Sequence, residues 1–593
     1  MKTQHRFRLL LILAVFLLAA LLLAGCAPTS WLATPTPTID LPAALTALAP
    51  SPDASLPTPA ISMDPTPTPV TDQLSDQPNL PQDVTQRLWV APYLPDDIMQ
   101  GTVAPVALEI VSDPELATLQ LDVSTQGVQV SSLVFALVAP FPTITDEISF
   151  ADLIAAWQGN PREYLSSGNL YITEHTSLIL SRIWGDPVGN FVRIAPEADL
   201  LATVWAEAPA WAIVPFEDLI PQWKVLVVDG QSPIRKDFKA ENYPLSLPVM
   251  LTGTSTDAVD QLAVALAESL PQTINRDPDS LTTVVLTGVT ALVRATAFEM
   301  EEKGVLHPAE EIGPMLREAD ILHISNEVPF AEACPFPKPV NDRLVFCSDD
   351  KYMELLEDIG TDVVELSGDH FSDWGTEATL HTFDLYDAEG WPYYGGGRTP
   401  EQGRLPITLE HNGNKIAFIG CNGKGGSYTP SVQGLPGAVD CDFDLITSEI
   451  ARLKSEGYVV IMTFQHHETY AFTPSIELIT EFHLTAEAGA DIVSGSQAHQ
   501  SHGMSFYAGS TVMYGLGNLF FDQLLMGENT SRAMIARHVI YQGRHISTEI
   551  ITIYFADFSE PLYLLGEERA RFLQQIFAAS DWGDLGIPGG YTP

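Results

Sequence analysis

Residues 361–375, TDVVELSGDHFSDWG, constrain the fold of this chain more than any other stretch. The apolar run 363–366 gives way to a Ser-Gly pair and then to Asp369, His370 and Asp373. This order is typical of a buried parallel strand that ends in a loop, and ligands of open α/β sheets bind at that edge. A carboxylate beside an imidazole suits a divalent metal or acid–base chemistry. The alternative is a helix start that Asp373 or the preceding serine caps.

The beginning of the chain predicts a targeting segment. Basic residues precede the apolar run 9–23, and LAGC at 23–26 resembles a bacterial lipobox, whose cysteine receives the lipid. The other interpretation, an uncleaved membrane-spanning helix, fits less well because the apolar run is short. We therefore expect residues 1–25 to be a lipoprotein signal peptide. The mature protein is then extracytoplasmic and lipid-anchored to the bacterial cell membrane through Cys26.

Composition divides the remainder into a spacer and two α/β regions. Residues 26–85 are rich in Pro, Thr, Ser and Asp, lack any helical or strand period, and predict a disordered, extended linker. The part that follows is too long for one hydrophobic core. Strand-like and helix-like segments alternate through it, which predicts the α/β class with two domains. We expect the first domain at 86–275, the second at 282–560 and a C-terminal tail at 561–593.

The charge of the chain limits its partners. It has 29 Lys and Arg against 75 Asp and Glu, a formal net charge of −46. A surface this acidic repels nucleic acid, so we expect no nucleic-acid partner. It also disfavours an extended polyanion, unless a local patch or bound cations offset the field. General acidity for solubility is the simpler explanation of the composition.

Four cysteines besides Cys26 form two local pairs in the sequence. Cys334 and Cys347 flank one loop, and Cys421 and Cys441 flank a Gly-rich loop. Three disulfide pairings are open to four cysteines, and in an exported protein the simplest joins each cysteine to its neighbour. No cysteine and histidine spacing in the sequence indicates zinc.

Two phrases in the first region, FALVAPFPTITDEISFADLIAAWQG and AWAIVPFEDLIPQWKVLVVDG, alternate apolar strands with helices. They resemble periplasmic solute-binding proteins of the phosphate-transport type, in which such strands line a cleft between two lobes. The resemblance implies a solute-binding-like α/β domain. No Ser/Thr-Gly loop identifies an anion site in this region, so a structural or docking domain is the alternative to a solute binder.

The second region carries an ordered series of polar phrases at expected strand ends. They are ILHISNEV, LSGDHFSDWG, GWPYYGGGRTP, TFQHHETY, GADIVSGSQAH and YGLGNLFF. In this order they resemble the CapA family, which is associated with poly-γ-glutamate capsule synthesis and shares the calcineurin-like metallophosphoesterase fold. The resemblance covers residues 282–560 and implies a metallophosphoesterase-like α/β sandwich.

Several positions match residues of that family's site. Asn326 and Glu327 match an Asn-Glu motif. His370 keeps the histidine of an Asn-Asn-His motif, in which Asp369 replaces an amide by a carboxylate, and His499 keeps the last histidine of Gly-His-His-Pro-His. The resemblance implies catalytic roles for Asp369, His370, Glu327 and His499. It implies metal ligands in Asp369, His370, Asn326 and His499.

Other family positions have lost their ligand type. Val289 replaces a metal-binding aspartate at the end of the first strand, and Gln465 and Gln497 stand where histidines are expected. His466, His467 and Glu468 are substitutes that are offset in register. A two-metal site needs more carboxylates and imidazoles than remain. We expect one divalent metal ion of unidentified type at most, with a metal-free polar pocket as the alternative.

Two functions from different classes follow from the resemblance. The first is a cell-surface, metal-dependent, phosphoesterase-like hydrolase or transferase in the synthesis or anchoring of poly-γ-glutamate, capsule or another envelope polymer. The second is a non-catalytic scaffold lipoprotein that binds a polymer or solute in a degenerate pocket. In both, the expected partners are an envelope polymer and, through the lipid, the membrane.

The anchoring hypothesis has a direct test in the lipobox cysteine. We expect Cys26→Ala to release the protein from the membrane fraction, because the lipid is attached to that sulfur. Fractionation followed by immunoblotting measures this, with a Cys334→Ala variant as the control that stays membrane-bound. A Cys26→Ala protein that remains in the membrane with its N-terminal segment uncut would contradict the lipoprotein interpretation.

Overall fold

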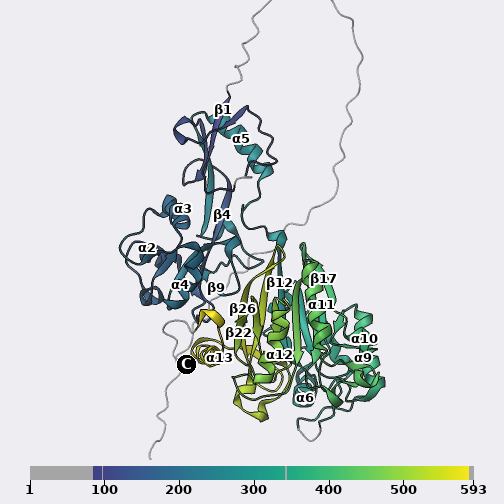
Figure 1. Ribbon diagram of the computed structural model, residues 1–593. Helices are drawn as coiled ribbons and strands as arrows, with labels where there is room; N and C mark the ends of the chain where they lie inside the picture. Colours follow the sequence, from purple (N-terminus) through teal and green to yellow (C-terminus); the bar gives the residue numbers. More distant parts are fainter. Residues whose placement is uncertain (1–84, 96–97, 341–343, 587–593) are drawn as a thin grey trace, which may run out of the picture. The chain divides into compact units, whose positions relative to one another are not determined.

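The computed structural model of the protein describes residues 85–95, 98–340 and 344–586 (Figure 1). The expected signal peptide, Cys26 and all but the last residue of the expected linker lie outside these residues. The described residues belong to a single unit, 79–593. None of the helices that the structure describes combines the length and the apolar composition needed to cross a bilayer.

The N-terminal region is built on a nine-stranded sheet with helices packed on it. Its strands follow the order β2 (Leu108–Ile110), β1 (Gln86–Val90), β3 (Leu119–Val123), β11 (Ser246–Gly253), β4 (Val128–Pro140), β8 (Trp211–Pro215), β6 (Leu170–Ile172) and β7 (Val192–Ile194), with β9 (Trp223–Val225) beside β4. A separate pair joins β5 (Glu147–Ile148) to β10 (Val227–Val228). The helices are α2 (Phe150–Trp157), α3 (Glu174–Trp184), α4 (Leu200–Ala206) and α5 (Thr256–Ser269). The expected α/β class is confirmed in this region.

Two larger sheets form the C-terminal region. The first has eight strands, in the order β15 (Tyr393–Tyr394), β14 (Val363–Glu365), β13 (Ile321–Asn326), β12 (Leu281–Thr290), β25 (Arg532–Tyr541), β26 (Arg544–Phe555) and β27 (Pro561–Tyr563), with β24 (Asn518–Phe520) beside β12. The second has six, in the order β17 (Ile407–His411), β18 (Asn414–Asn422), β20 (Val459–Gln465), β21 (Ile492–Ser494), β23 (Ser510–Met513) and β22 (Met504–Tyr507). A short pair joins β16 (Gly396–Gly397) to β19 (Gly437–Ala438).

Side chains along β12 show how the two sheets pack. Val284 and Leu286 lie in the hydrophobic cluster between the sheets, together with Ile461 of β20. Val285 points the other way and packs with Leu322 under the helices. Successive side chains of a strand face opposite sides of the sheet, so both faces of β12 are covered. This double burial explains why the strand is apolar almost throughout.

Helices cover the outer face of each sheet, which gives a helix–sheet–sheet–helix sandwich (Figure 1). The first sheet is covered by α6 (Arg294–Lys303), α7 (Gly313–Arg317), α8 (Met353–Asp358) and α9 (Gly375–Glu389). The second is covered by α11 (Phe443–Ser455) and α12 (Ile476–Glu487), while α10 (Pro400–Gly403) is a single turn. Asp442 and Ser475 cap α11 and α12 by accepting backbone N–H groups. The expected two-domain α/β class and sandwich are thereby confirmed.

The turn between β17 and β18 follows directly from its residues. Asn412 and Gly413 both have positive φ, at 49° and 73°, and close an antiparallel hairpin. Asparagine and glycine tolerate that conformation better than other residues, and the Asn-Gly pair is typical of two-residue hairpins. The hairpin predicted from NG within ITLEHNGNKIAFIG is confirmed.

The segment expected as a C-terminal tail contains two further elements in its described part. After β27, helix α13 (Gly566–Ala578) buries Phe572 and Ile576 in the cluster between the sheets. Residues four apart lie on one face of a helix, so these two side chains reach the core together. The sandwich therefore extends beyond residue 560, to at least the end of α13.

Both disulfides join sequence neighbours. Cys334 is bonded to Cys347 and Cys421 to Cys441, with Cα atoms 5.8 and 5.1 Å apart. This is the simplest of the three pairings. The second bond ties the end of β18 to the segment before α11, and both ends belong to the part of the chain that carries the site described below.

Removing the second bond should therefore weaken the fold measurably. We expect Cys421→Ser together with Cys441→Ser to lower the free energy of unfolding by about 3 kcal/mol, because the bond closes a loop of 20 residues in the unfolded chain. Urea unfolding of the oxidised protein measures the change, and peptide mapping without reduction checks the pairing. Four free thiols in the untreated protein would contradict the assignment.

Candidate functional site

The site lies where strands of both sheets of the sandwich end. In the first sheet β12, β13 and β14 run parallel, and in the second β18, β20 and β21 do so. Asn326 ends β13, Asp369 follows β14, Gln465 ends β20 and His499 follows β21. The sequence predicts such residues at strand ends, at the edge of a sheet where ligands bind. They come instead from two sheets whose carboxyl ends converge.

Gly368 allows two of these strand ends to approach closely. A Cβ atom at this position would lie 2.7 Å from the Cα and 2.8 Å from the carbonyl oxygen of Glu327. Any larger residue would push the loop after β14 away from the end of β13. The glycine of SGDH thus acts on the site through backbone contact, and it brings Asp369 next to Glu327.

Glu327, Asp369 and His370 form a group that can hold a metal ion. One ligand atom from each lies within 4.8 Å of the others. Glu327 is buried, and neither of its carboxylate oxygens has a hydrogen-bond partner among the described residues. Burial and the neighbouring Asp369 carboxylate raise the pKa of Glu327 well above its ordinary value. Two carboxylates and an imidazole are a fitting set for a divalent cation, which would supply the missing partner of Glu327.

The carboxylate of Asp369 interacts with several neighbouring side chains of the site. Its Oδ2 accepts a hydrogen bond from Lys424 Nζ at 2.5 Å, and its Oδ1 accepts one from Gln465 Nε2 at 2.9 Å. Burial alone would raise the pKa of Asp369, but Lys424 and the His370 imidazole outweigh it and hold that pKa below its ordinary value. Asp369 is therefore ionised at neutral pH.

His370 is held in its cationic form. Its Nδ1 lies 2.7 Å from Asp373 Oδ2, and its ring contacts the edge of Phe346 at 4.8 Å between centroids. Burial lowers the pKa of His370, but Asp373, Glu327 and Asp369 raise it to about 9. A metal ion bound to this ring would displace the proton.

His499 is oriented by an asparagine. Asn518 Nδ2 donates to the carbonyl oxygens of His499 and Thr530, so Asn518 Oδ1 accepts from His499 Nδ1 at 3.0 Å. The other ring nitrogen, Nε2, then carries the lone pair and lies 3.7 Å from Glu327 and 3.9 Å from Glu468. Burial lowers the pKa of His499. A neutral imidazole fixed in this way is a typical metal ligand or proton acceptor.

Lys424 is the site residue that the sequence analysis missed. Its Nζ contacts Asp369 at 2.5 Å and Glu468 at 2.9 Å, with 7% of the side chain exposed. Burial lowers the pKa of Lys424, but the two carboxylates raise it above its ordinary value. It sits in CNGKGG directly after β18, at the same end of the sheet as the other site residues. That position after a parallel strand was the available clue.

These groups open into a cavity of about 600 Å³. Its lining includes three cationic side chains, Arg294, His370 and Lys424. It also includes three carboxylates, from Asp369, Asp373 and Glu468, and the aromatic rings of Phe346, Tyr428, Tyr470 and Phe521. Cationic and acidic groups are thus balanced there, in a chain whose overall charge is strongly negative.

Asn326 and Val289 were also singled out in the sequence. Asn326 donates through Nδ2 to the Val328 carbonyl and the Tyr386 hydroxyl, and its Oδ1 is buried without a hydrogen-bond partner among the described residues. Val289 is fully buried in an apolar cluster that contains Val328, Phe346 and Phe521. Phe346 contacts the ring of His370, and Phe521 contacts the ring of His499. Val289 therefore packs in the same cluster as the rings that contact the two site histidines.

Two other histidines after β20 and β21, His466 and His502, have partners of their own. His466 Nε2 lies 3.1 Å from Glu481 on α12, and His502 Nδ1 lies 2.6 Å from the carbonyl oxygen of Ala471. Gln497 is buried, and neither its oxygen nor its nitrogen has a hydrogen-bond partner among the described residues.

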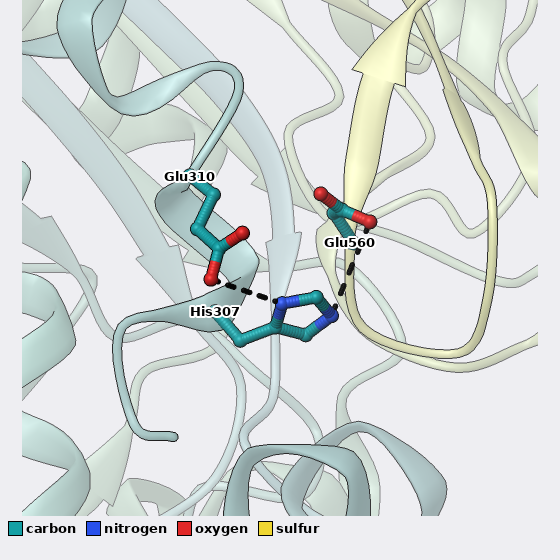
Figure 2. A group of neighbouring side chains, drawn as sticks. All are labelled: His307, Glu310 and Glu560. Atoms are coloured by element: carbon teal, nitrogen blue, oxygen red, sulfur yellow. Dashed lines mark ion pairs between the residues drawn. The ribbon is translucent and has the colours of Figure 1, made fainter. Parts of the chain in front are cut away.

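A second group of potential ligands, at His307, Glu310 and Glu560, differs in kind (Figure 2). His307 lies between the two glutamates, 3.4 Å from Glu310 and 4.0 Å from Glu560. Asp557 approaches the same ring at 3.3 Å and also pairs with Lys303. The Glu310 side chain is 64% exposed. These contacts form a surface ion-pair network that ties the segment after α6 to the turn between β26 and β27.

Comparison with known proteins identifies the region that holds the site. Residues 283–523 match the family described as "Bacterial capsule synthesis protein PGA_cap". The resemblance to the CapA family is confirmed. Glu327, Asp369, His370, Lys424 and His499 all lie inside the PGA_cap match.

Two curated relatives agree with the PGA_cap match. "PGA biosynthesis protein CapA" of Bacillus subtilis (strain 168) is 22% identical over 224 residues, which are 38% of this chain and 59% of the relative. "Capsule biosynthesis protein CapA" of Bacillus anthracis is 20% identical over 265 residues, which are 44% of this chain and 64% of the relative. The chain thus spans less than two thirds of the length of either relative.

Two of the similar solved structures are an enzyme and a transport receptor. NAD nucleotidase NadN of Haemophilus influenzae is 11% identical over 51% of this chain and 57% of its own, with a TM-score of 0.27. An ABC-type phosphate transport receptor of Vibrio cholerae is 10% identical over 30% of this chain and 93% of its own, with a TM-score of 0.24. With TM-scores this low, the fold is established by the strand order given above and not by these neighbours.

The buried Glu327 should make stability depend on pH when metal is absent. Because its pKa is raised in the folded state, the unfolded chain loses this proton first as pH rises above about 4.3, and unfolding becomes easier. The free energy of unfolding then falls by up to about 1.4 kcal/mol per pH unit. We expect Glu327→Gln to abolish this dependence on pH, because glutamine carries no ionisable proton. Urea unfolding in EDTA between pH 5 and 6 measures it, and Glu310→Gln is the exposed control. Equal slopes for Glu327→Gln and the unaltered protein would contradict the burial argument.

Proposed function

We propose that this protein is a lipid-anchored, extracytoplasmic component of capsule or envelope polymer assembly. Its C-terminal site binds one divalent cation and, with it, a carboxylate-bearing polymer such as poly-γ-glutamate. The match of residues 283–523 to a capsule synthesis family supports the pathway. One observation supports the cation: Glu327 is buried beside Asp369 and His370, and neither of its oxygens has a hydrogen-bond partner among the described residues.

Different residues of the site would bind the cation, exchange a proton and line the cavity. Glu327, Asp369 and His370 would hold the cation, and the cation would polarise an anionic group of the ligand. His499 is a neutral base 3.7 Å from Glu327, and the pair can exchange a proton with a bound molecule. Phe346, Tyr428, Tyr470 and Phe521 form the apolar and aromatic part of the cavity lining. The balanced charge of the lining reduces the repulsion that the chain as a whole exerts on a polyanion.

A scaffold without catalysis is the second candidate. Both oxygens of Asp369 already accept hydrogen bonds, from Lys424 and Gln465. Gln465 and Val289 stand at family positions where a metal ligand is expected. A site of this kind can bind a polymer through its cations and leave the polymer intact.

Metal and polymer binding test the proposal together. We expect the purified mature protein to bind about one Mn²⁺ per chain in equilibrium dialysis, and Glu327→Gln to weaken this affinity about tenfold or more because it removes an anionic ligand. Glu310→Gln is the matched control in the surface network of Figure 2, and it should leave the affinity unchanged. Loss of binding in Glu310→Gln and not in Glu327→Gln would move the site to the surface.

Poly-γ-glutamate then separates the two functions. We expect the polymer to sediment with the protein only when Mn²⁺ is present, and less with Glu327→Gln. Shortening of the polymer over time indicates the hydrolase, and an unchanged length indicates the scaffold. Metal binding without any effect on the polymer would contradict the proposed ligand while it leaves the cation site intact.

A further inference from the structure

The ammonium group of Lys424 lies beside the potential metal-ligand set of this site and shares Asp369 with it. Glu327, Asp369 and His370 form that set. Lys424 Nζ bridges the carboxylates of Asp369 and Glu468 at 2.5 and 2.9 Å, and His499 Nε2 lies 3.9 Å from the same Glu468 oxygen. A carboxylate shared by two neighbouring cation positions is the arrangement of a two-metal centre.

We propose that the ammonium group of Lys424 permanently fills the second cation position, so that this site takes only one exchangeable metal ion. The inference deepens the proposed function, on which its first cation rests. It explains the site by the contacts of Lys424 as well as by the missing ligand types at Val289 and Gln465. Lys424 supplies the positive charge that Asp369 and Glu468 require, from within the chain.

The loop after β18 is built to hold Lys424 in that place. Asn422 Oδ1 accepts hydrogen bonds from the backbone N–H groups of Lys424 and Gly425, at 2.9 and 3.2 Å. Asn422 Nδ2 donates to the carbonyl oxygen of Ser367 at 2.8 Å, which fastens this loop to the one that carries Asp369. The disulfide at Cys421 lies directly before. The lysine is therefore positioned by a fixed backbone and not by a free surface loop.

An ammonium differs from a metal ion in ways that matter for the site. It carries one positive charge instead of two, donates hydrogen bonds in place of accepting ligand electron pairs, and does not leave when chelators are added. The site would thus offer an anionic ligand one permanent cation and one exchangeable cation side by side. Carboxylate groups of a polymer suit such a pair.

Removal of the ammonium tests the inference through metal stoichiometry. We expect Lys424→Met to raise Mn²⁺ bound per chain from about one to about two, because the two carboxylates then need another cation. Equilibrium dialysis gives the number. Electron paramagnetic resonance gives the arrangement: an isolated Mn²⁺ signal for the unaltered protein and a spin-coupled pair for the variant. Lys424→Met combined with Glu468→Gln should return the number to about one.

Matched controls separate this effect from general charge loss. Lys415→Met removes an exposed lysine from β18, the strand before the loop that carries Lys424, and Lys424→Arg keeps the cation, so both should stay at about one Mn²⁺. Should Lys424→Met fail to fold, Lys424→Gln carries the same comparison. A spin-coupled pair in the unaltered protein, or no second ion in either folded Lys424 variant, overturns the inference. An unaltered protein that binds no metal refutes the proposed function alone, and a gain of one ion in Lys424→Met then still supports the role of Lys424.

Discussion

The burial of Asp369 between an ammonium group and a second carboxylate is the interaction on which the rest of this site depends. Its side chain is 4% exposed, and an ionised carboxylate so far from water is unstable without a cation in contact. Lys424 supplies that cation. Glu327, beside Asp369, has no such partner among the described residues and keeps its proton in the absence of metal. The two acids thus differ in charge because only one of them touches the lysine.

The sandwich makes this crowding of charges possible. Parallel strands of two facing sheets end at the same side, so loops from both meet there, and Gly368 removes the last steric obstacle between Asp369 and Glu327. Behind them the support is apolar: Val289, Phe346 and Phe521 fill the space under the histidines. An aspartate at 289 would therefore replace apolar packing by a charge as well as adding a ligand, which links the missing carboxylate to the core.

The sequence was sufficient for the features that depend on local chemistry. The hairpin at Asn412 follows from a turn that few other residue pairs can form, and the strand before Asp369 follows from its apolar run and its glycine. It was not sufficient for Lys424. A lysine in a Gly-rich loop is usually a solvated surface residue, and only the three-dimensional convergence of two sheets brings it against Asp369 and Glu468. The same convergence explains why residues of two sheets form one site, which the spacing of apolar residues in the sequence does not show.

Charge also connects this one site to the chain as a whole. With a net charge of −46 the protein repels polyanions at long range, yet the cavity is lined by as many cationic side chains as carboxylates. Screening in salt shortens the repulsion to roughly 8 Å, so contacts within the cavity are governed by its own groups. A divalent cation held by Glu327, Asp369 and His370 would displace the protons of Glu327 and His370, so the cavity would stay close to neutral while the outer surface remains acidic. Binding of an acidic polymer in the cavity would then depend on the metal, because the bound cation can coordinate a polymer carboxylate directly.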